Sequence, residues 1–304
     1  MKRQLVLGVL VGLGAASIGL AALQQPAGGG QPATRVVEVD KLKDNLYMLR
    51  GNGGGGNTAV FVMTDGVTVV DTKNPGWGQP ILDKIKTLTD KPVTMLINTH
   101  THGDHVSGNV EFPATVDVVV QENTKANMEK MDIFKQNNNR GMAKRTFKDK
   151  MTLGKGADQI DLYYFGPGHT NGDAIVVFPA LRTAHLGDLF ANKGLPLVDG
   201  ANGGSVLQYP DTVMKVYNGV KNVDTVINGH SNTTMTWPDV KEFADFNRDF
   251  LTWAQGELKA GKTPEQAAPE WKVPDKYKGY SSQVAALFGG LPGRIQRLAD
   301  EMKK

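Results

Sequence analysis

The sequence predicts an α/β fold built in layers, and three patterns lead to this fold class. Short apolar or alternating runs come first, helix-like and strand-like segments then alternate, and the last part of the chain becomes helical. Alternating elements of this kind are stable when helices cover the faces of a sheet, because each element must bury its apolar side. With 304 residues, the chain is long enough to form one large core.

The first segments are expected to be strands joined by a glycine-rich loop. Residues Val36–Arg50 and Thr58–Asp71 are apolar or alternating, like two neighbouring strands. Between them lies the segment Gly51-Asn52-Gly53-Gly54-Gly55-Gly56-Asn57. A phosphate-binding loop would end in Lys-Ser or Lys-Thr and lead into a helix. Because a strand follows here instead, the glycines are expected to form a mobile hairpin.

Helices and strands are then expected to alternate. Helical spacing is found at Ile81–Leu88 and Asn123–Lys135, and a buried strand lies between them at Val93–Asn98. Further strands are expected at three apolar runs: Ile160–Phe165, Ala174–Phe178 and Thr183–Leu186.

The region 236–304 is expected to be helical and to pack back on the core. Its apolar residues recur at helical spacing and form one stripe: Val240, Phe243, Phe246, Phe250 and Trp253. The segment Thr263-Pro264-Glu265-Gln266 has the pattern of a capping box with proline at the first helical position. Arg294–Met302 predicts a terminal helix.

Half of the histidines lie in one short segment that directly follows a predicted strand. The chain has six histidines, and three fall within His100-Thr101-His102-Gly103-Asp104-His105. Imidazole nitrogens and carboxylate oxygens are ligands that zinc takes at about 2.0–2.2 Å. Two histidines at i and i+2 on an extended backbone point to the same side. Most single histidines are packed or surface residues, but packing gives no reason for four ligand-type residues in six, so the segment predicts a metal site.

Three further ligand-type residues follow predicted strands. His169 stands in Phe165-Gly166-Pro167-Gly168-His169, Asp188 in Leu186-Gly187-Asp188 and His230 in Val226-Ile227-Asn228-Gly229-His230. Functional side chains on an α/β scaffold usually lie at the ends of strands. These residues bring the set to seven candidate ligands for two metals. His185 would point opposite to Asp188 on an alternating strand, so it is expected to be structural.

At this point the chain resembles the metallo-β-lactamase superfamily. The family's motifs occur here in order: Asp71 in Val69-Val70-Asp71-Thr72, the H-x-H-x-D-H cluster, His169 in G-P-G-H-T, Asp188 in G-D-L-F, and His230 in N-G-H. The resemblance implies a four-layer αβ/βα sandwich of two mixed β-sheets with helices on the outer faces. It also implies that the glycine hairpin lies over the metals as a flap.

The resemblance assigns roles to the individual residues. It implies a first metal held by His100, His102 and His169, and a second held by Asp104, His105 and His230. Asp188 would bridge the two ions, and Asp71 would steady the ligand loop through outer hydrogen bonds. Asp104 and Asp188 are the expected catalytic carboxylates.

These assignments imply a binuclear hydrolase with two zinc ions per chain, iron or manganese being the alternatives. A hydroxide shared by the ions would attack an ester, thioester, lactone, amide or phosphodiester of a small molecule. Zinc β-lactamases of the family commonly have a cysteine at the position of Asp188 or no ligand there, whereas a bridging Asp resembles glyoxalase II, lactonase and phosphodiesterase members. Zinc β-lactamase activity is therefore the first alternative. A mono-iron oxidoreductase similar to persulfide dioxygenases is the second.

Contacts with the substrate are weakly indicated by the sequence. Asn192 and Lys193 follow Asp188 closely, and a lysine shortly after the second metal's ligand contacts the substrate carboxylate in some zinc β-lactamases, although the spacing differs here. Trp77 in Pro75-Gly76-Trp77-Gly78 either lines the groove or packs in the core, and the core is favoured.

The N-terminus has the pattern of an export signal. Lys2 and Arg3 precede an uncharged apolar run, and small residues offer a cleavage site before residue 24. We expect residues 1–23 to be a signal peptide, 24–34 a flexible linker and 35–304 the catalytic domain, which places the protein in the periplasm or outside the cell. The alternative is an uncleaved anchor, because the run is long enough to span a bilayer and would give the protein a membrane partner.

Charge and cysteine content exclude other roles. The net charge of +3 falls to about +1 without Lys2 and Arg3, so there is no electrostatic case for a nucleic-acid partner. The one basic run, 140–150, is expected to be a solvated connection, the alternative being that it flanks the site and favours an anionic substrate. The chain has no cysteine, so it has neither disulfides nor a thiolate ligand.

Overall fold

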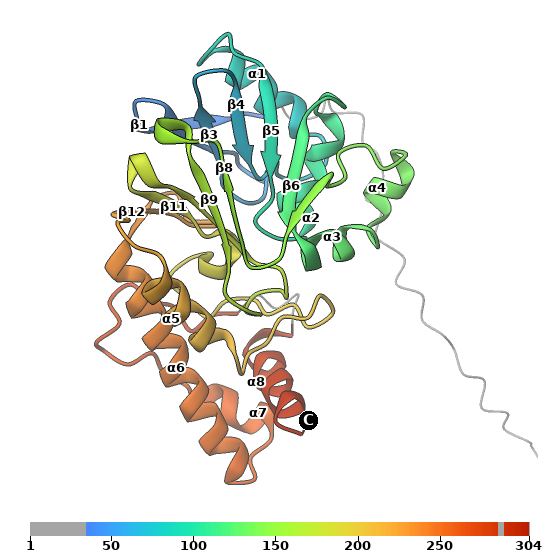
Figure 1. Ribbon diagram of the computed structural model, residues 1–304. Coiled ribbons are helices and arrows are strands. Elements are labelled where there is room, and N and C mark those ends of the chain that lie inside the picture. The colour runs from blue at the N-terminus through green and yellow to red at the C-terminus, as the bar shows by residue number, and fades with distance from the viewer. Residues whose placement is uncertain (1–34, 285–288, 304) are drawn as a thin grey trace, which may run out of the picture. The chain divides into compact units, whose positions relative to one another are not determined.

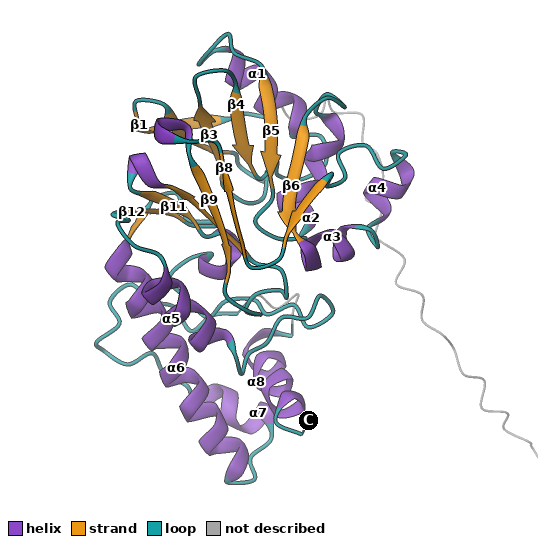
Figure 2. Ribbon diagram, viewed as in Figure 1, coloured by secondary structure: helices purple, strands orange, loops and turns teal. Residues whose placement is uncertain are grey.

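The computed structural model describes residues 35–284 and 289–303. They form two mixed β-sheets that pack face to face and carry helices on their outer sides (Figures 1 and 2). The four-layer arrangement expected from the sequence is therefore confirmed. The expected signal peptide at 1–23 and linker at 24–34 lie outside the described residues. Within the part of the chain that is described, no helix is both long and apolar enough to cross a membrane.

The first sheet has seven strands in chain order. They are β1 (Glu38–Lys43), β2 (Leu46–Arg50), β3 (Thr58–Val62), β4 (Val67–Val70), β5 (Val93–Ile97), β6 (Asp117–Gln121) and β7 (Arg145–Phe147). Strands β1 to β4 pair antiparallel, and β4 to β7 pair parallel.

Each of the two N-terminal runs forms a hairpin and not a single strand. The run 36–50 turns at Asp44-Asn45 between β1 and β2, and the run 58–71 turns at Asp65-Gly66 between β3 and β4. Asp, Asn and Gly stabilise turns, since their side chains or their lack of one permit the necessary backbone angles. The expectation of one strand per run was wrong in this detail.

The second sheet contains the next six strands. They are β8 (Lys150–Leu153), β9 (Ile160–Tyr164), β10 (Ala174–Phe178), β11 (Thr183–His185), β12 (Thr225–Ile227) and β13 (Met235–Thr236). The spatial order is β13-β12-β11-β10-β9-β8, and the pair β11 and β12 is parallel.

The basic run 140–150 contains β7 and the turn by which the chain passes from the first sheet to the second. Its basic side chains at 144, 145, 148 and 150 are exposed, as expected of a solvated connection. The Arg145 guanidinium pairs with Asp117 on β6 at 2.8 Å, and the Lys144 Nζ donates to the carbonyl of Ala114 at 2.6 Å. These cations stabilise a sheet edge.

Eight α-helices complete the described fold. They are α1 (Gly78–Lys86), α2 (Gly103–Val106), α3 (Glu122–Met128), α4 (Asp132–Gln136), α5 (Tyr209–Gly219), α6 (Trp237–Lys259), α7 (Pro264–Ala267) and α8 (Gly290–Glu301). The expected helix at 123–135 is thus two short helices, α3 and α4. Helix α5 is not among the helices that the sequence patterns predict.

The layers are held together by three apolar clusters. The cluster between the sheets contains residues of both, and the Phe61 and Phe178 rings meet there at 5.0 Å. A second cluster packs α1 on the outer face of the first sheet. The third packs α5 and α6 on the second sheet, where the Phe243 ring of α6 stacks on Phe190 at 4.4 Å.

The expected features of the C-terminal region are present. Val240, Phe243, Phe246 and Phe250 are buried along α6, as the apolar stripe predicts. Trp253 continues the stripe and packs on Trp271 at 5.0 Å. The capping box is formed, since Thr263 and Gln266 exchange both of their hydrogen bonds at the start of α7.

Candidate metal centre

Loops after four strands bring the seven candidate ligands together. His100, His102, Asp104 and His105 lie in the loop after β5 and in α2. The other three come from the second sheet: His169 follows β9, Asp188 follows β11 and His230 follows β12. Because these strands end near one another, their loops meet although they are far apart in the chain.

The candidate ligands form two adjacent groups, and one carboxylate of the first group also faces the second. His100, His102, His169 and Asp188 form the first group, and Asp104, His105 and His230 form the second. In each group the potential ligand atoms lie within 4.8 Å of one another. Asp188 Oδ2 is 3.7 Å from His169 Nε2 and 3.1 Å from His230 Nε2, so its carboxylate faces both groups.

The donor atoms fit divalent metal ions. Among the described residues, His100 Nε2 and Asp188 Oδ1 are buried and have no hydrogen-bond partner. Each such atom costs about 1–3 kcal/mol if it remains unsatisfied. In the first group His169 Nε2 and His102 Nδ1 face each other at 3.0 Å, and in the second His105 Nε2 and His230 Nε2 do so at 3.5 Å. One metal ion in each group would satisfy these atoms.

Asp71 orients the two histidines that lie deepest. Its Oδ2 accepts from His105 Nδ1 at 2.7 Å and from the Thr99 hydroxyl at 2.7 Å, and its Oδ1 accepts from the Thr99 backbone N–H. The same hydroxyl lies 3.0 Å from His100 Nδ1. These bonds fix the rings so that Nε2 of both histidines faces the centre of the cluster. Asp71 itself is buried and has a left-handed backbone with φ of 62°.

Asp199 and the carbonyl of Leu197 orient the other two histidines of the first group. Asp199 Oδ2 lies 2.8 Å from His102 Nε2, and the Leu197 carbonyl lies 2.9 Å from His169 Nδ1. Sequence analysis missed Asp199, because Asp199-Gly200 has the pattern of an ordinary turn. The loop 196–206 therefore fixes the orientation of two histidines through the Asp199 side chain and the Leu197 carbonyl.

Burial and charge set the protonation of the histidines. Burial, together with neighbouring histidines, lowers the pKa of His100 well below its usual value and that of His169 to about 4. Both rings are therefore neutral, as metal ligands must be. Burial also acts to lower the pKa of His105, but Asp188 and Asp71 outweigh it and raise that pKa well above its usual value.

The glycine-rich loop is fastened to the cluster. The Gly56 N–H donates to the Asp104 carbonyl at 3.1 Å, and the Asn57 N–H donates to the Gly229 carbonyl at 2.6 Å. A side chain at Gly56 would place its Cβ 2.1 Å from the His105 ring. The glycines of the second half of the loop therefore permit close packing on the candidate ligands, whereas Gly53 is exposed.

Lys73 is a second residue that sequence analysis missed. It is fully buried, and its Nζ donates to the Gly56 carbonyl at 2.5 Å. Burial lowers the pKa of Lys73 to about 8, although Asp71 and Asp104 act to raise it. Its ammonium group thus lies against the glycine-rich loop, where the charges of Asp71 and Asp104 act on it.

Asn192, Lys193 and Trp77 are not brought into the cluster. Lys193 Nζ pairs with Asp239 at the start of α6 at 2.6 Å, and Asn192 is exposed. Trp77 is 5% exposed and belongs to the cluster of the first sheet, with its ring against Gly51. The core location favoured by the sequence is the one observed for Trp77.

His185 uses both ring nitrogens within the fold. Its Nδ1 accepts from the Gly187 backbone N–H at 3.0 Å, and its Nε2 lies 3.2 Å from the Asn57 carbonyl. The neutral ring with its proton on Nε2 satisfies both contacts. His185 therefore links β11 to the glycine-rich loop and has no free nitrogen for a metal.

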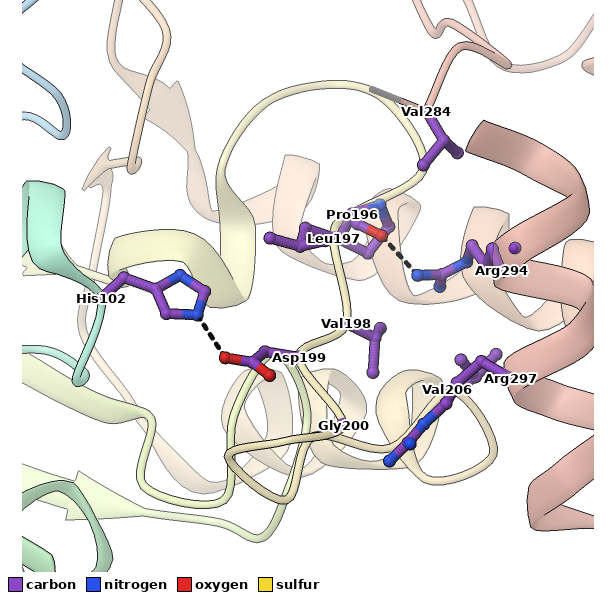
Figure 3. A pocket seen from close by; sticks show the side chains of 11 residues that line it. His102, Pro196, Leu197, Val198, Asp199, Gly200, Val206, Val284, Arg294 and Arg297 are labelled. Atoms are coloured by element: carbon purple, nitrogen blue, oxygen red, sulfur yellow. Dashed lines mark hydrogen bonds and ion pairs between the residues drawn. The ribbon is translucent and has the colours of Figure 1, made fainter. Parts of the chain in front are cut away.

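Two cavities adjoin the cluster from different sides. One of about 380 Å³ lies between the glycine-rich loop, Arg50 and His230. The other, of about 310 Å³, extends from His102 and Asp199 to α8 (Figure 3). Each cavity is lined by one candidate ligand, His230 in the first and His102 in the second.

Comparison with known proteins agrees with this geometry. The family model of the metallo-beta-lactamase superfamily matches residues 51–231, more than half of the chain. A metallo-beta-lactamase type 2 from Elizabethkingia meningoseptica is 28% identical over 220 residues, which cover 68% of this chain and 82% of that protein. A hydroxyacylglutathione hydrolase from Crocosphaera subtropica is 27% identical over 159 residues, and the match spans about half of each protein.

A solved structure shares the fold. The metallo-beta-lactamase from Pontibacter korlensis superposes with a TM-score of 0.58 and 21% identity, over 70% of this chain and 99% of that one. Fold, site and relatives together define a metal-dependent hydrolase. The chain belongs to the metallo-β-lactamase superfamily.

Proposed function

We propose that the chain is an exported binuclear zinc hydrolase that cleaves an ester, thioester, lactone, amide or phosphodiester bond of a small molecule. One observation carries the proposal: the carboxylate of Asp188 belongs to the first group of candidate ligands and also faces the histidines of the second. A buried structural zinc site has four ligands, and its ion is closed off from substrate. Seven candidate ligands, among them a carboxylate that faces both groups, lie next to two cavities and fit two ions that remain open to a substrate.

The candidate ligands would be divided between the two ions. His100, His102 and His169 would hold the first ion, Asp104, His105 and His230 the second, and Asp188 both. Bound zinc supplies Lewis acidity, which makes a nearby water more acidic and polarises the oxygen of the bond to be cleaved.

Asp104 is suited to orient the attacking water. Its side chain is 31% exposed, whereas that of Asp188 is 9% exposed. Its Oδ2 lies 3.4 Å from His230 Nε2, at the open side of the second group. A carboxylate that is fixed at one oxygen and reaches solvent can accept a proton from water in a defined direction.

Hydrolysis of β-lactams is the second candidate. The relative from Elizabethkingia, a metallo-beta-lactamase by name, supports it. The carboxylate at position 188 and the pairing of Lys193 with Asp239 count against it, because that ammonium does not point to the cluster.

Metal content and turnover test the proposal together. The full-length gene would be expressed, the mature protein purified, and its metals measured by mass spectrometry. Turnover of nitrocefin, a lactone, a thioester and bis-p-nitrophenyl phosphate would be measured on the same sample. We expect two zinc ions per chain, turnover of at least one compound, and an N-terminus near residue 24. One iron per chain with no turnover would overturn the hydrolase in favour of the oxidoreductase.

Variants connect the result to the site. His169→Ala should lose the first metal and most of the activity, whereas Asp211→Asn, a surface change on α5, should keep both. Asp188→Cys should keep metal and shift turnover toward β-lactams if this residue sets the substrate class. Full activity of His169→Ala with less than one metal per chain would contradict the ligand assignment.

A further inference from the structure

The cavity beside His102 has charges of opposite sign at its two ends. His102 and Asp199 lie at one end, and Arg294 and Arg297 of α8 lie at the other (Figure 3). The lining also contains four apolar side chains: Leu197, Val198, Val206 and Val284. The cavity therefore offers a partly apolar passage that leads from a candidate metal ligand to two guanidinium groups.

Arg294 is a buried cation without a carboxylate partner. It is 5% exposed, and among the described residues no carboxylate lies within 4.0 Å of its guanidinium. Its donors reach the Pro196 carbonyl and, at 3.4 Å, Asn247 Oδ1, while Nε has no partner. The Tyr209 and Phe250 rings face it at 5.7 and 5.4 Å.

The charge of Arg294 persists at neutral pH. Burial lowers its pKa to about 10, so the group remains protonated. Burying a charge costs several kcal/mol unless an opposite charge or a sufficient set of hydrogen bonds compensates it. Two aromatic faces and two neutral acceptors compensate it in part. An anion in the adjoining cavity would complete the compensation.

Arg297 lies one turn further along α8 and lines the same cavity. Its Nε pairs with Glu301 at 3.2 Å, and one amino group donates to the Gly204 carbonyl at 3.1 Å. The guanidinium lies flat against Gly200, where any side chain would overlap it. With its side chain 33% exposed, Arg297 is fixed in place and still accessible.

Asp199 lies at the end of the cavity opposite to the two arginines. Its carboxylate lies beside His102, and both oxygens are occupied: Oδ2 faces His102 and the Asn202 amide, and Oδ1 accepts from the backbone of Ala201 and Asn202. The negative charge thus lies beside His102. The positive charges at the α8 end favour one orientation of an elongated acid.

We propose that this cavity selects a substrate whose apolar chain ends in a carboxylate, with the carboxylate at Arg294 and Arg297 and the chain running toward His102. The inference rests on the proposed hydrolase and names its substrate class. It makes Arg297 a specificity-determining residue supplied by the C-terminal helix.

Matched esters test the inference. Mono-p-nitrophenyl esters of adipic, suberic and sebacic acid would be compared with the neutral p-nitrophenyl hexanoate, octanoate and decanoate. The readout is the ratio of kcat/KM for the acid and the neutral ester of equal length. We expect the wild type to prefer the acid at least about tenfold at one chain length, which corresponds to about 1.4 kcal/mol.

Variants assign the preference to the cavity. In Arg297→Gln the ratio should fall toward one, and Arg297→Lys should retain part of it. Arg248→Gln, which removes a surface arginine paired with Asp211, is the matched control and should leave the ratio unchanged. Val284→Trp should lower kcat/KM for the longest esters by narrowing the passage. A ratio in Arg297→Gln equal to that of the wild type would overturn the inference.

A binding measurement separates this inference from the proposed function. Octanoate would be titrated calorimetrically into the purified protein and the same variants. Binding that is lost in Arg297→Gln but kept in Arg248→Gln supports the cavity even if no ester is cleaved. If esters are cleaved without a preference for the acid, the proposed hydrolase function is supported and the proposed role of the cavity is rejected. Octanoate binding that is equal in Arg297→Gln and wild type would reject it as well.

Discussion

At the scale of single residues, the site depends on carboxylates that touch histidines and not the metals. Asp71 and Asp199 each accept from the imidazole nitrogen that faces away from the cluster. An imidazole with one nitrogen bonded in this way presents the other as a lone pair in a fixed direction. The loss of such a partner should therefore weaken metal binding more than it weakens the fold.

The variant Asp199→Asn tests this at the more exposed of the two carboxylates. It keeps the shape of the side chain but removes the charge that faces His102. We expect zinc affinity of the first group to fall about 10- to 100-fold, with the second group little changed. Competition with a fluorescent chelator would measure both affinities. Asp211→Asn is the control, and an unchanged first affinity would refute the role of Asp199.

Lys73 should impose a pH dependence on stability. Its pKa is about 8 in the folded protein and about 10.4 in an unfolded chain, so the unfolded state binds more protons between these values. Burial of the protonated Lys73 ammonium destabilises the folded state by its full amount below pH 8, and this cost decreases as the pH rises. Between pH 7 and pH 10 the free energy of unfolding of the metal-free wild type should rise by about 2 kcal/mol relative to that of Lys73→Met.

Urea titrations of both proteins at several pH values would measure this gain. Because every other titrating group is common to the two proteins, the difference isolates Lys73. Parallel pH profiles would show that the Lys73 ammonium is stabilised as well in the fold as in water.

The sequence predicted the type and location of the seven candidate ligands because His and Asp cluster at strand ends. The partners Asp199 and Lys73 could not be predicted in the same way. Asp199 contacts a histidine 97 positions earlier in the chain, and the role of Lys73 depends on a loop carbonyl above it. Such contacts exist only once the loops are placed.

At the scale of elements, the glycine-rich loop acts as a packed cover of the site. Its second half approaches Asp104 and His105 so closely that a methyl group does not fit at Gly56. The amino-acid pattern alone predicts mobility, because glycine is permissive in any loop. The structure shows that the absence of side chains serves close contact here.

The variant Gly56→Ala tests the close contact directly. Its Cβ would push the His105 ring out of position, so we expect loss of the second metal and a large fall in activity. Gly53→Ala in the same loop is the control, since no atom lies within 4 Å of its Cβ and only its backbone angle is strained. Metal content and turnover of both variants would be compared. Two metals per chain in Gly56→Ala would show that the loop can move to accommodate the added methyl group.

Element boundaries were predicted less well than element types. The two N-terminal runs were predicted as strands but their internal turns were not, since Asp44-Asn45 and Asp65-Gly66 are short interruptions in apolar patterns. The expected helix at 123–135 is broken between α3 and α4. Helix α5 escapes prediction because its buried stripe covers few turns and begins beside Pro210.

At the scale of the whole molecule, the layered fold was predictable because apolar periodicity repeats over many elements. The cooperative stability of that fold should depend on the metals, since the candidate ligands come from both sheets. A ligand at one hundred times its dissociation constant stabilises the folded state by about 2.7 kcal/mol.

Metal removal should therefore lower the thermal midpoint. We expect chelation to lower Tm by roughly 5–10 °C while unfolding remains a single transition, and zinc should restore it. Scanning calorimetry of the treated and the reconstituted protein measures this. A Tm that is the same with and without zinc would indicate that the ions do not hold the sheets together.

The strand order has one more consequence. The chain completes the first sheet before it begins the second, and it crosses between them at residues 148–149. Each group of candidate ligands takes members from both halves, so neither half retains a complete site. If the chain were cut at this crossing, the ions would connect the two fragments. Zinc-dependent reassembly of the fragments would then report that the two halves have docked.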